Sequence, residues 1–333
     1  MVIIMKKDTP PPALQQLAVT LQQKGVRAAR TDTNEHLLLT LVGDTWQLDT
    51  ASLQALPFVE DVKRLTPPYH LAGRACHSAD TVVSVGEARI GQDFCLIAGP
   101  CAVESAPQMD VVSRAVKAGG AQLLRGGLFK PRTSPYAFQG YGEAGLPLLL
   151  EARRQTGLPV VTEITDAAQL HLFEDVDVIQ VGARNMQNYA LLQALASFGK
   201  PVLLKRSLSA TVDELLQSAE YLLHGGNTQV ILCERGVRTF SQETRATLDL
   251  CAVPVLKKVT HLPVIVDPSH ATGYAHLVKP MALAAAVAGA DGLMIEVHND
   301  PPHALSDGAQ SLTPDAFDDV AKCVFAVRPY ACR

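Results

Sequence analysis

The sequence predicts an α/β protein in which a small ferredoxin-like β-α-β-β-α-β domain precedes a (β/α)₈ barrel, the TIM-barrel architecture. From residue 94 onward, short apolar strand patterns alternate eight times with helical patterns. Strands that are apolar on both faces and separated by helices are typical of a parallel sheet. The first 65 residues instead order their patterns as strand, helix, strand, strand, helix, strand, which is the ferredoxin-like split unit.

Residues 1–65 are expected to form the small domain. Its first helix, "PPALQQLAVTLQQKG", has prolines at its start and Gly25 at its end, where helices favour them. A shorter helix is expected at "DTASLQAL", and strands are expected at "VIIM", "VRAAR", "HLLLTLVG" and "FVEDVKRL". The segment carries no catalytic constellation, so it is either a packing module or a regulatory, ligand-sensing module.

Residues 66–92 are expected to form a linker and a β-hairpin. "TPPYHLAGRACHSADT" combines proline, glycine and polar residues without periodicity, which indicates a connection. "TVVSVGEARIG" alternates around a glycine, a pattern that favours a hairpin.

Residues 93–333 are expected to form the barrel, because eight strand–helix units over roughly 240 residues match its usual size. A doubly wound open sheet is the competing fold, but no G-x-G-x-x-G follows the first strand. The expected strands are "FCLIAG", "AQLLRGG", "PVVTE", "VDVIQVG", "PVLLKR", "TQVILCERG", "PVIVD" and "GLMIEV". Helices are expected after each, including "DAAQLHLFED" after the third strand and a weaker pattern over 243–259.

Composition narrows the partners of the protein. A net charge of −4 over 333 residues gives no basic excess to neutralise a nucleic-acid backbone. The longest apolar stretch is far shorter than a membrane span, and five residues before a lysine pair are too few for a signal peptide. The seven cysteines show no C-x-x-C spacing. We therefore expect a cytoplasmic protein with a small-molecule partner, and neither nucleic-acid nor membrane binding.

A first set of residues at the expected strand ends suits a divalent metal ion. A thiol, an imidazole and two carboxylates favour Mn, Fe, Co or Zn over Mg or Ca, which prefer oxygen alone. Taken singly, each has a plainer interpretation, since a lone cysteine is usually a buried filler. His298 is an alternative ligand, and Asp267 is a candidate neighbour of the ligands. The four expected ligands are Cys101, His270, Glu296 and Asp307.

A second set of residues at the same strand ends is cationic and indicates a small polyanionic substrate. Arginine offers a bidentate fork for phosphate or carboxylate, and lysine offers a point charge. The loop "KPRTS" adds the hydroxyls of Thr133 and Ser134, which suit a second phosphate. The cations are Arg125, Lys130, Arg132, Arg184, Lys205 and Arg235.

Eight motifs in order resemble the 3-deoxy-D-arabino-heptulosonate 7-phosphate (DAHP) synthases, and more narrowly their type I beta subfamily. They are "AGPCAVES", "LLRGGLFKPRTSPYAFQG", "VGARNMQN", "LLKR", "ILCERG", "VDPSHATG", "MIEVH" and "ALSDGAQSL". The resemblance covers the barrel from about residue 90 to the end. The N-terminal unit is also similar to the ferredoxin-like extension found in part of that subfamily.

The resemblance implies an enzyme that condenses phosphoenolpyruvate with D-erythrose 4-phosphate and water, releasing phosphate, at the first step of the shikimate pathway. It implies one divalent metal ion per subunit on Cys101, His270, Glu296 and Asp307. Phosphoenolpyruvate would lie against Arg125, Lys130, Arg184, Lys205 and Arg235. The aldose phosphate would lie against Lys130, Pro131, Arg132, Thr133 and Ser134.

In the implied mechanism, the metal polarises the aldehyde and C3 of the enol phosphate attacks it. Water adds at C2, and phosphate leaves by C–O cleavage. Lys130 would protonate the new alkoxide and Glu163 would position the water. The resemblance further implies a homotetramer in which tyrosine or phenylalanine acts through the N-terminal domain as a feedback inhibitor.

Two alternatives remain beside this interpretation. The related 3-deoxy-octulosonate 8-phosphate synthases use the same barrel with arabinose 5-phosphate, but their version of the loop "KPRTS" contains an asparagine, and some lack the metal and the cysteine. A regulatory subunit or sugar-phosphate sensor without activity is the second alternative. Such a chain could lose a metal ligand, and none of the four is missing here.

Overall fold

The computed structural model describes residues 1–33, 36–64 and 67–332. The chain divides into two compact units, Met1–His70 and Leu71–Arg333, called unit 1 and unit 2 below. The boundary that the sequence predicts between residues 65 and 66 lies outside the described ranges. No helix in these ranges is long and apolar enough to cross a membrane.

Unit 1 has the predicted β-α-β-β-α-β order. Its sheet runs β2-β3-β1-β4, with β1 antiparallel to both of its neighbours. In β1 and β3, buried and less buried positions alternate, so one face of the sheet meets the apolar sides of the helices. The elements are β1 (Val2–Lys6), α1 (Pro11–Gln23), β2 (Arg27–Asp32), β3 (His36–Val42), α2 (Thr50–Gln54) and β4 (Val59–Lys63).

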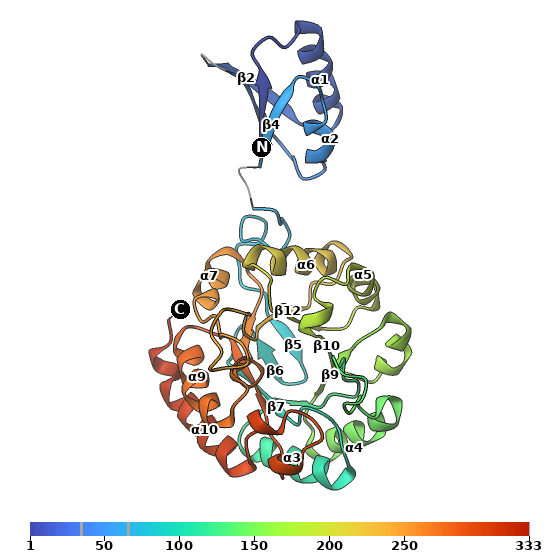
Figure 1. The fold of residues 1–333 in the computed structure, drawn as a ribbon, viewed down its shortest axis with the longest axis vertical. Coiled ribbons are helices and arrows are strands. Elements are labelled where there is room, and N and C mark those ends of the chain that lie inside the picture. The colour runs from blue at the N-terminus through green and yellow to red at the C-terminus, as the bar shows by residue number, and fades with distance from the viewer. Residues whose placement is uncertain (34–35, 65–66, 333) are drawn as a thin grey trace. The chain divides into compact units, whose positions relative to one another are not determined.

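Unit 2 contains the predicted eight-stranded parallel barrel, closed by pairing of its first strand with its last. All eight strands are almost wholly buried, which explains why their sequences are apolar on both faces. Figure 1 shows the helices arranged as a ring around them. The strands are β7 (Cys95–Gly99), β8 (Leu123–Arg125), β9 (Val160–Ile164), β10 (Val178–Val181), β11 (Val202–Lys205), β12 (Val230–Glu234), β13 (Val264–Val266) and β14 (Gly292–Glu296).

The connections agree with the predicted helices except at two places. "DAAQLHLFED" forms a 3₁₀ helix, η2 (Ala167–Phe173), rather than an α-helix. Its larger rise per residue lets seven residues cover more of the connection to β10. The weak pattern over 243–259 becomes helical only at α7 (Ala252–Val259). The other helices are α3 (Ala106–Ala118), α4 (Leu146–Thr156), α5 (Tyr189–Phe198), α6 (Val212–His224), α8 (Pro268–Thr272), α9 (Ala275–Val287) and α10 (Pro314–Val327).

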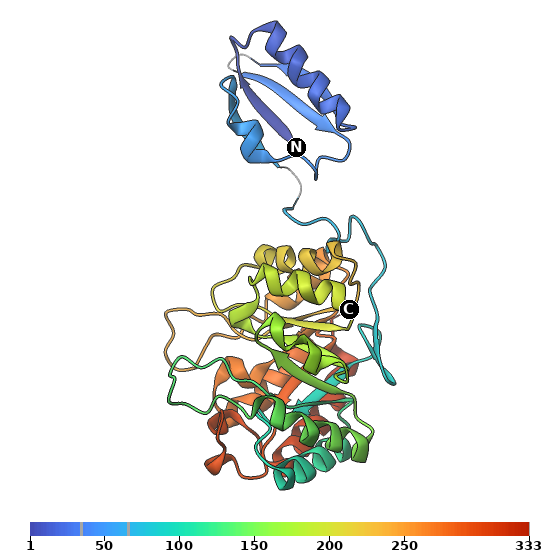
Figure 2. The same ribbon diagram turned by 90° about the vertical axis from the view of Figure 1, so that its right-hand side faces the viewer.

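The predicted hairpin, β5 (Val83–Val85) and β6 (Ala88–Ile90), closes one end of the barrel. Its four inward side chains join one apolar cluster with residues of all eight strands, among them Cys95, Leu123 and Val178. Figure 2 shows the hairpin at the end of the barrel opposite its two long loops, which follow β8 and β12. The hairpin end is therefore a packed floor, and the loop end is left for function.

Gly99, the last residue of β7, allows the first two strands of the barrel to approach closely. Its φ is 149°, and a Cβ atom there would lie 2.1 Å from the carbonyl oxygen of Arg125. Only glycine fits this position, which lies directly before the loop that carries Cys101.

Candidate active site

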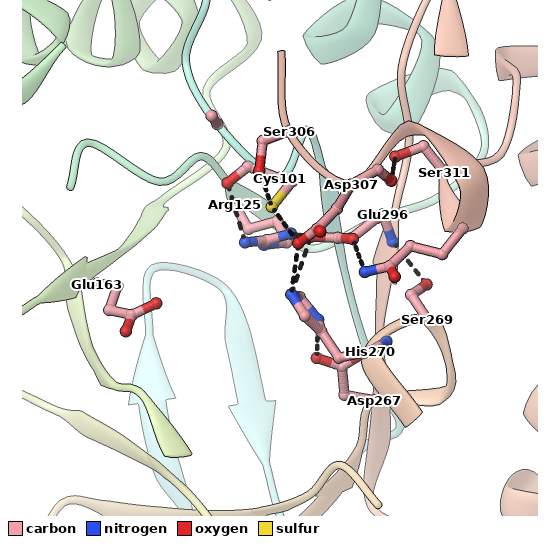
Figure 3. Close-up of polar contacts among 12 residues, drawn as sticks. Cys101, Arg125, Glu163, Asp267, Ser269, His270, Glu296, Ser306, Asp307 and Ser311 are labelled. Carbon is pink, nitrogen blue, oxygen red and sulfur yellow. Dashed lines mark hydrogen bonds and ion pairs between the residues drawn. The ribbon is translucent and has the colours of Figure 1, made fainter. Parts of the chain in front are cut away.

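The four expected metal ligands converge at the loop end of the barrel. Cys101 follows β7, His270 lies on α8, Glu296 ends β14, and Asp307 lies in the loop after β14. One donor atom from each can be chosen so that all four atoms lie within 4.8 Å of one another. Figure 3 shows the four side chains pointing toward a common centre. We call them the four-residue group.

His270 is oriented by the carboxylate that precedes its helix. Its Nδ1 lies 2.7 Å from Oδ2 of Asp267, and its backbone N–H donates to Oδ1 of the same residue at 2.9 Å. Asp267 also forms a buried ion pair with Lys205. A carboxylate only accepts, so Nδ1 carries the proton and the lone pair of Nε2 is free.

The free Nε2 of His270 faces two carboxylates. It lies 3.2 Å from Oε1 of Glu296 and 3.8 Å from Oδ2 of Asp307. Burial lowers the pKa of His270, which favours the neutral ring. Three acceptor atoms thus face one another, and a cation between them would satisfy all three. The Asp267 carboxylate behind the histidine is the usual hydrogen-bond partner of a metal-binding imidazole. The donor set therefore fits a metal ion.

Cys101 is buried beside an acidic side chain and a basic one. Its Sγ donates to Oδ2 of Asp307 at 3.2 Å, receives a hydrogen bond from Nζ of Lys130 at 3.1 Å, and lies 3.1 Å from Oγ of Ser306. Burial, reinforced by the charge of Glu296, raises the pKa of the Cys101 thiol to about 12. The thiol is therefore protonated unless a cation binds, since coordination deprotonates it.

Glu296 is held from two sides. Arg125 forms a buried ion pair with it, and Nε2 of Gln310 donates to its Oε2 at 2.5 Å. Burial alone would raise the pKa of Glu296, but the positive charges around it, those of Arg125 and Lys130 among them, outweigh burial and lower that pKa. Glu296 is therefore an ionised ligand candidate, and Arg125 acts as its counter-ion.

A cavity of about 80 Å³ adjoins the four-residue group, and its walls are mainly cationic. The side chains of Glu163 and Gln180 also line it, and Nε2 of Gln180 donates to Oε2 of Glu163 at 2.9 Å. Figure 3 shows the Glu163 carboxylate apart from the four-residue group. The cations that line the cavity are Lys130, Arg132, Arg184, Lys205, Arg235 and Arg245.

Arg235 carries a direct indication of a ligand. The residue is 6% exposed; its Nη2 donates to the carbonyl of His270 at 3.1 Å, and its buried Nη1 has no partner. Burial lowers the pKa of this guanidinium. A buried N–H group without an acceptor is energetically costly. An anion bound in the cavity would supply the missing hydrogen-bond acceptor.

The structure separates some of the predicted substrate residues from this cavity. Thr133 and Ser134 are exposed and do not line it, whereas Lys130, Pro131 and Arg132 do. Arg125 lies behind Glu296 rather than on the cavity wall. His298, the alternative metal ligand, is engaged with Glu104 instead.

Sequence reasoning missed Arg245, which lines the cavity from the long loop between β12 and α7. Its Nη1 lies 3.3 Å from Oδ1 of Asp307 and donates to Oε1 of Gln310 at 3.0 Å. The sequence pattern predicts a helix for this segment, but the structure forms a loop there, and the loops after barrel strands are where site residues belong.

Comparison with known proteins agrees with this geometry. The profile of the DAHP synthetase I family matches residues 78–330, and that of the DAHP synthase ferredoxin-like domain matches residues 1–67. A phospho-2-dehydro-3-deoxyheptonate aldolase of Thermotoga maritima is 42% identical over 324 residues, which are 97% of this chain and 96% of that protein. A 2-dehydro-3-deoxyphosphooctonate aldolase of Nitrobacter winogradskyi is 34% identical over 270 residues, 75% of this chain and 93% of that protein.

Solved structures give the same result. A crystal structure of phospho-2-dehydro-3-deoxyheptonate aldolase (DAHP synthase) from Thermotoga maritima matches with a TM-score of 0.87 at 41% identity, covering 96% of this chain and 95% of that one. A truncated form of that organism's 3-deoxy-D-arabino-heptulosonate 7-phosphate synthase matches with a TM-score of 0.71 at 44% identity, covering 76% and 93%. The chain therefore belongs to the DAHP synthetase I family and carries that family's ferredoxin-like N-terminal domain.

Proposed function

We infer that this chain is a DAHP synthase, condensing phosphoenolpyruvate with D-erythrose 4-phosphate and water to give DAHP and phosphate. The similarity to the Thermotoga maritima aldolase over 97% of the chain carries this conclusion. The cationic residues of the cavity beside the four-residue group suit the phosphate and carboxylate groups of these substrates. The alternative, a synthase that uses arabinose 5-phosphate, is not favoured, because the octulosonate relatives match only about 75% of the chain at lower identity.

We propose that the four-residue group holds one divalent cation per subunit. The family is generally dependent on a divalent metal, and a thiolate with an imidazole favours Mn, Fe, Co or Zn over Mg or Ca. When bound, such a cation supplies a Lewis acid for the aldehyde oxygen.

The cationic residues have a binding role in this proposal. Arg184, Lys205 and Arg235 hold the phosphate and carboxylate of phosphoenolpyruvate, with the unpaired Nη1 of Arg235 as one donor. Lys130 completes that set, and Arg125 adds its charge from behind Glu296. The loop Lys130–Ser134 holds the aldose phosphate, with Arg132 on the cavity wall. Holding two mutually repelling anions in contact is a large part of the catalysis.

Lys130 and Glu163 have the proton-handling roles. C3 of the enol phosphate attacks the aldehyde carbon, and the new alkoxide takes a proton from Nζ of Lys130, which lies between the cavity and Cys101. Water then adds at C2, guided by the Glu163 carboxylate that Gln180 fixes in the cavity, and the proton that the water gives up restores the one lost by Lys130. Phosphate leaves by cleavage of its C–O bond.

We propose a regulatory role for unit 1, with tyrosine or phenylalanine as the inhibitor of a cytoplasmic homotetramer. Unit 1 has its own apolar core. It also contains a cavity of about 350 Å³ between α1 and α2, lined by Leu17, Leu21 and Phe58 among others. Deleting residues 1–65 should abolish inhibition by these amino acids, and inhibition that persists undiminished would contradict the proposal.

The central test is phosphate release from phosphoenolpyruvate by chelator-treated protein, with erythrose 4-phosphate or arabinose 5-phosphate and with or without Mn²⁺. We expect turnover with the four-carbon sugar that returns only with the metal. Turnover with the five-carbon sugar alone would assign the chain to the octulosonate synthases. A folded sample that is silent with both sugars would show a binding protein.

A further inference from the structure

Glu104 and His298 form a largely buried pair that joins two loops of the barrel. Nε2 of His298 lies 3.1 Å from Oε2 of Glu104, and Nδ1 of His298 accepts a hydrogen bond from the backbone of Asp300 at 2.9 Å. Because Nδ1 accepts, Nε2 must carry the proton and donate to Glu104. Glu104 is itself anchored near α3, since its backbone N–H donates to the side chain of Gln108 at 2.9 Å.

The second oxygen of Glu104 holds the loop that carries Asp307. Its Oε1 accepts a hydrogen bond from the backbone N–H of Leu305 at 3.0 Å. Two backbone hydrogen bonds of 2.9 Å close the base of this loop: the N–H of His298 donates to the carbonyl of Leu312, and the N–H of Leu312 donates to the carbonyl of Glu296. Glu104 therefore fixes a point two residues before Asp307, far from the closed base in sequence.

Asp307 needs such support because its backbone is strained. Its φ is 54°, and among the residues that the structure describes it is the sole non-glycine with positive φ. A left-handed conformation at a non-glycine residue persists only where the surroundings impose it. Glu104 and His298 do not line the cavity, so their contacts bear on the loop and not on a substrate.

We propose that Glu104 and His298 are positioning residues that set the affinity of the four-residue group for its cation. They act by holding Leu305, and through it the backbone that presents the Asp307 carboxylate. The pair also ties the loops of Cys101, Glu296 and Asp307 to one another, since Glu104 follows Cys101 by three residues and His298 follows Glu296 by two. This inference rests on the proposed metal site.

The test is titration of the full-length, metal-stripped protein with Co²⁺, whose charge-transfer absorption reports a bound thiolate. In Glu104→Gln, the amide turns its NH₂ toward one of two donors, so one hydrogen bond is lost. We expect Co²⁺ affinity to fall about tenfold, the low end of the effect seen for groups that support metal ligands. Saturating Co²⁺ or Mn²⁺ should restore kcat, because no substrate contact changes.

Glu220→Gln is the matched control. Glu220, on α6, likewise accepts two hydrogen bonds, here from the backbone N–H groups of Leu71 and Ala72, at 2.8 and 2.9 Å. A purely structural role for Glu104 would lower Tm in both variants and leave Co²⁺ affinity unchanged in both. We expect the affinity to change only in Glu104→Gln.

A double-mutant cycle identifies the residue through which Glu104 acts. In an Asp307→Ala background, Glu104→Gln should alter Co²⁺ affinity by less than about twofold. An effect as large as in the wild type would overturn the proposal. His298→Gln, which retains a donor toward Glu104, should bind Co²⁺ better than His298→Ala; equal binding by the two would also overturn it.

The wild-type titration separates this inference from the proposed function. A wild-type protein that binds no Co²⁺ removes the proposed metal site and the inference together. A wild-type protein that binds Co²⁺, with Glu104→Gln binding it equally well in a folded state, removes the inference alone.

Discussion

The two ends of the barrel are formed by the same eight strands but by opposite kinds of side chain. At the hairpin end, β5 and β6 and the starts of the strands form an apolar cluster. At the loop end, the four-residue group and the cationic cavity lie beside two buried ion pairs, Arg125–Glu296 and Lys205–Asp267. Burying charge is costly even when it is paired. We therefore infer that the hairpin end stabilises the fold and that the buried charges of the loop end destabilise it.

The two cysteines at the ends of strand β7 show the same contrast between the hairpin end and the loop end. Cys95, at its start, and Cys101, just past its end, are both buried thiols, and burial raises the pKa of each to about 12. Cys95 lies in the apolar cluster, whereas Cys101 touches Asp307, Lys130 and Ser306. Their surroundings, rather than their own chemistry, distinguish a core residue from a candidate ligand.

The largest expected effect comes from exchanging these two thiols for alanine. Cys101→Ala should lower kcat/KM about a thousandfold or more, since a Lewis acid contributes several kcal/mol to a transition state. Cys95→Ala should retain activity and lose some stability from the lost packing. Steady-state phosphate release, Co²⁺ titration and urea unfolding of both variants measure this. Similar activity losses in the two variants would erase the contrast.

Lys130 should give the next largest effect. Lys130→Ala removes the proposed proton donor, and kcat should fall about a hundredfold, within the usual range for general acids. Lys130→Arg keeps the charge but holds its proton too tightly, so it should recover KM for phosphoenolpyruvate more than kcat. Near-normal turnover by Lys130→Ala would remove this role from the mechanism.

At the hairpin end, Ile90→Ala should affect stability and not chemistry. Ile90 is fully buried in the apolar cluster, so its truncation should cost about 2–5 kcal/mol of unfolding free energy. The folded fraction should keep its kcat/KM. Val82→Ala, at an exposed residue directly before β5, is the control and should cost less than about 0.5 kcal/mol. A loss of kcat/KM in folded Ile90→Ala would show that the ends are coupled.

Glu163→Gln tests whether the cavity and the four-residue group have separate roles at the loop end. The change removes a carboxylate that Gln180 holds in the cavity, and kcat should fall about tenfold if the carboxylate guides water, below the usual range for a full general base. Co²⁺ affinity should stay constant, because Glu163 lies apart from the four-residue group. Unchanged turnover would exclude the water-positioning role.

The smallest expected effect is a pH dependence at the hairpin end. His261, just before β13, accepts from the hydroxyl of Thr81 at 2.7 Å and donates to the carbonyl of Leu71 at 2.7 Å. Burial lowers the pKa of His261 in the folded protein. The folded state therefore binds its proton less readily than the unfolded state, whose pKa is about 6.5.

The stability from His261 should be present above about pH 6.5 and decline as pH falls through the lower folded pKa. The difference in urea midpoint between the wild type and His261→Gln, which does not titrate, should narrow from pH 7.5 to pH 5. A difference that is constant over this range would contradict the effect of burial.

The fold and much of the site geometry could be anticipated because they are local properties of the sequence. Each barrel strand is an apolar run, and charged residues follow at its end, so parallel strands must bring those residues to one face. The predicted fold class is confirmed by the closed barrel and the ferredoxin-like sheet. The convergence of Cys101, His270, Glu296 and Asp307 follows from the same rule.

What escaped sequence reasoning depends on contacts between loops. Arg245 reaches Asp307 from a loop whose pattern suggests a helix, and Glu104, after β7, reaches Leu305 in the loop after the neighbouring strand β14. Thr133 and Ser134 suit a phosphate by residue type; both are exposed and do not line the cavity, so their role in binding the aldose phosphate stays a prediction. Such contacts depend on the path of each loop in space, and the hydrophobic periodicity of the sequence does not predict that path.

The position of the four-residue group on the barrel has a further consequence. The first strand, β7, and the last, β14, are paired with each other. Cys101 follows β7, Glu296 ends β14, and Asp307 lies in the loop after β14. A cation held there would act as a removable crosslink between the beginning and the end of the barrel chain. By mass action, a hundredfold excess over its dissociation constant would add about 2.7 kcal/mol to the folded state. The concentration of metal would then set the stability of the folded barrel as well as the rate of catalysis.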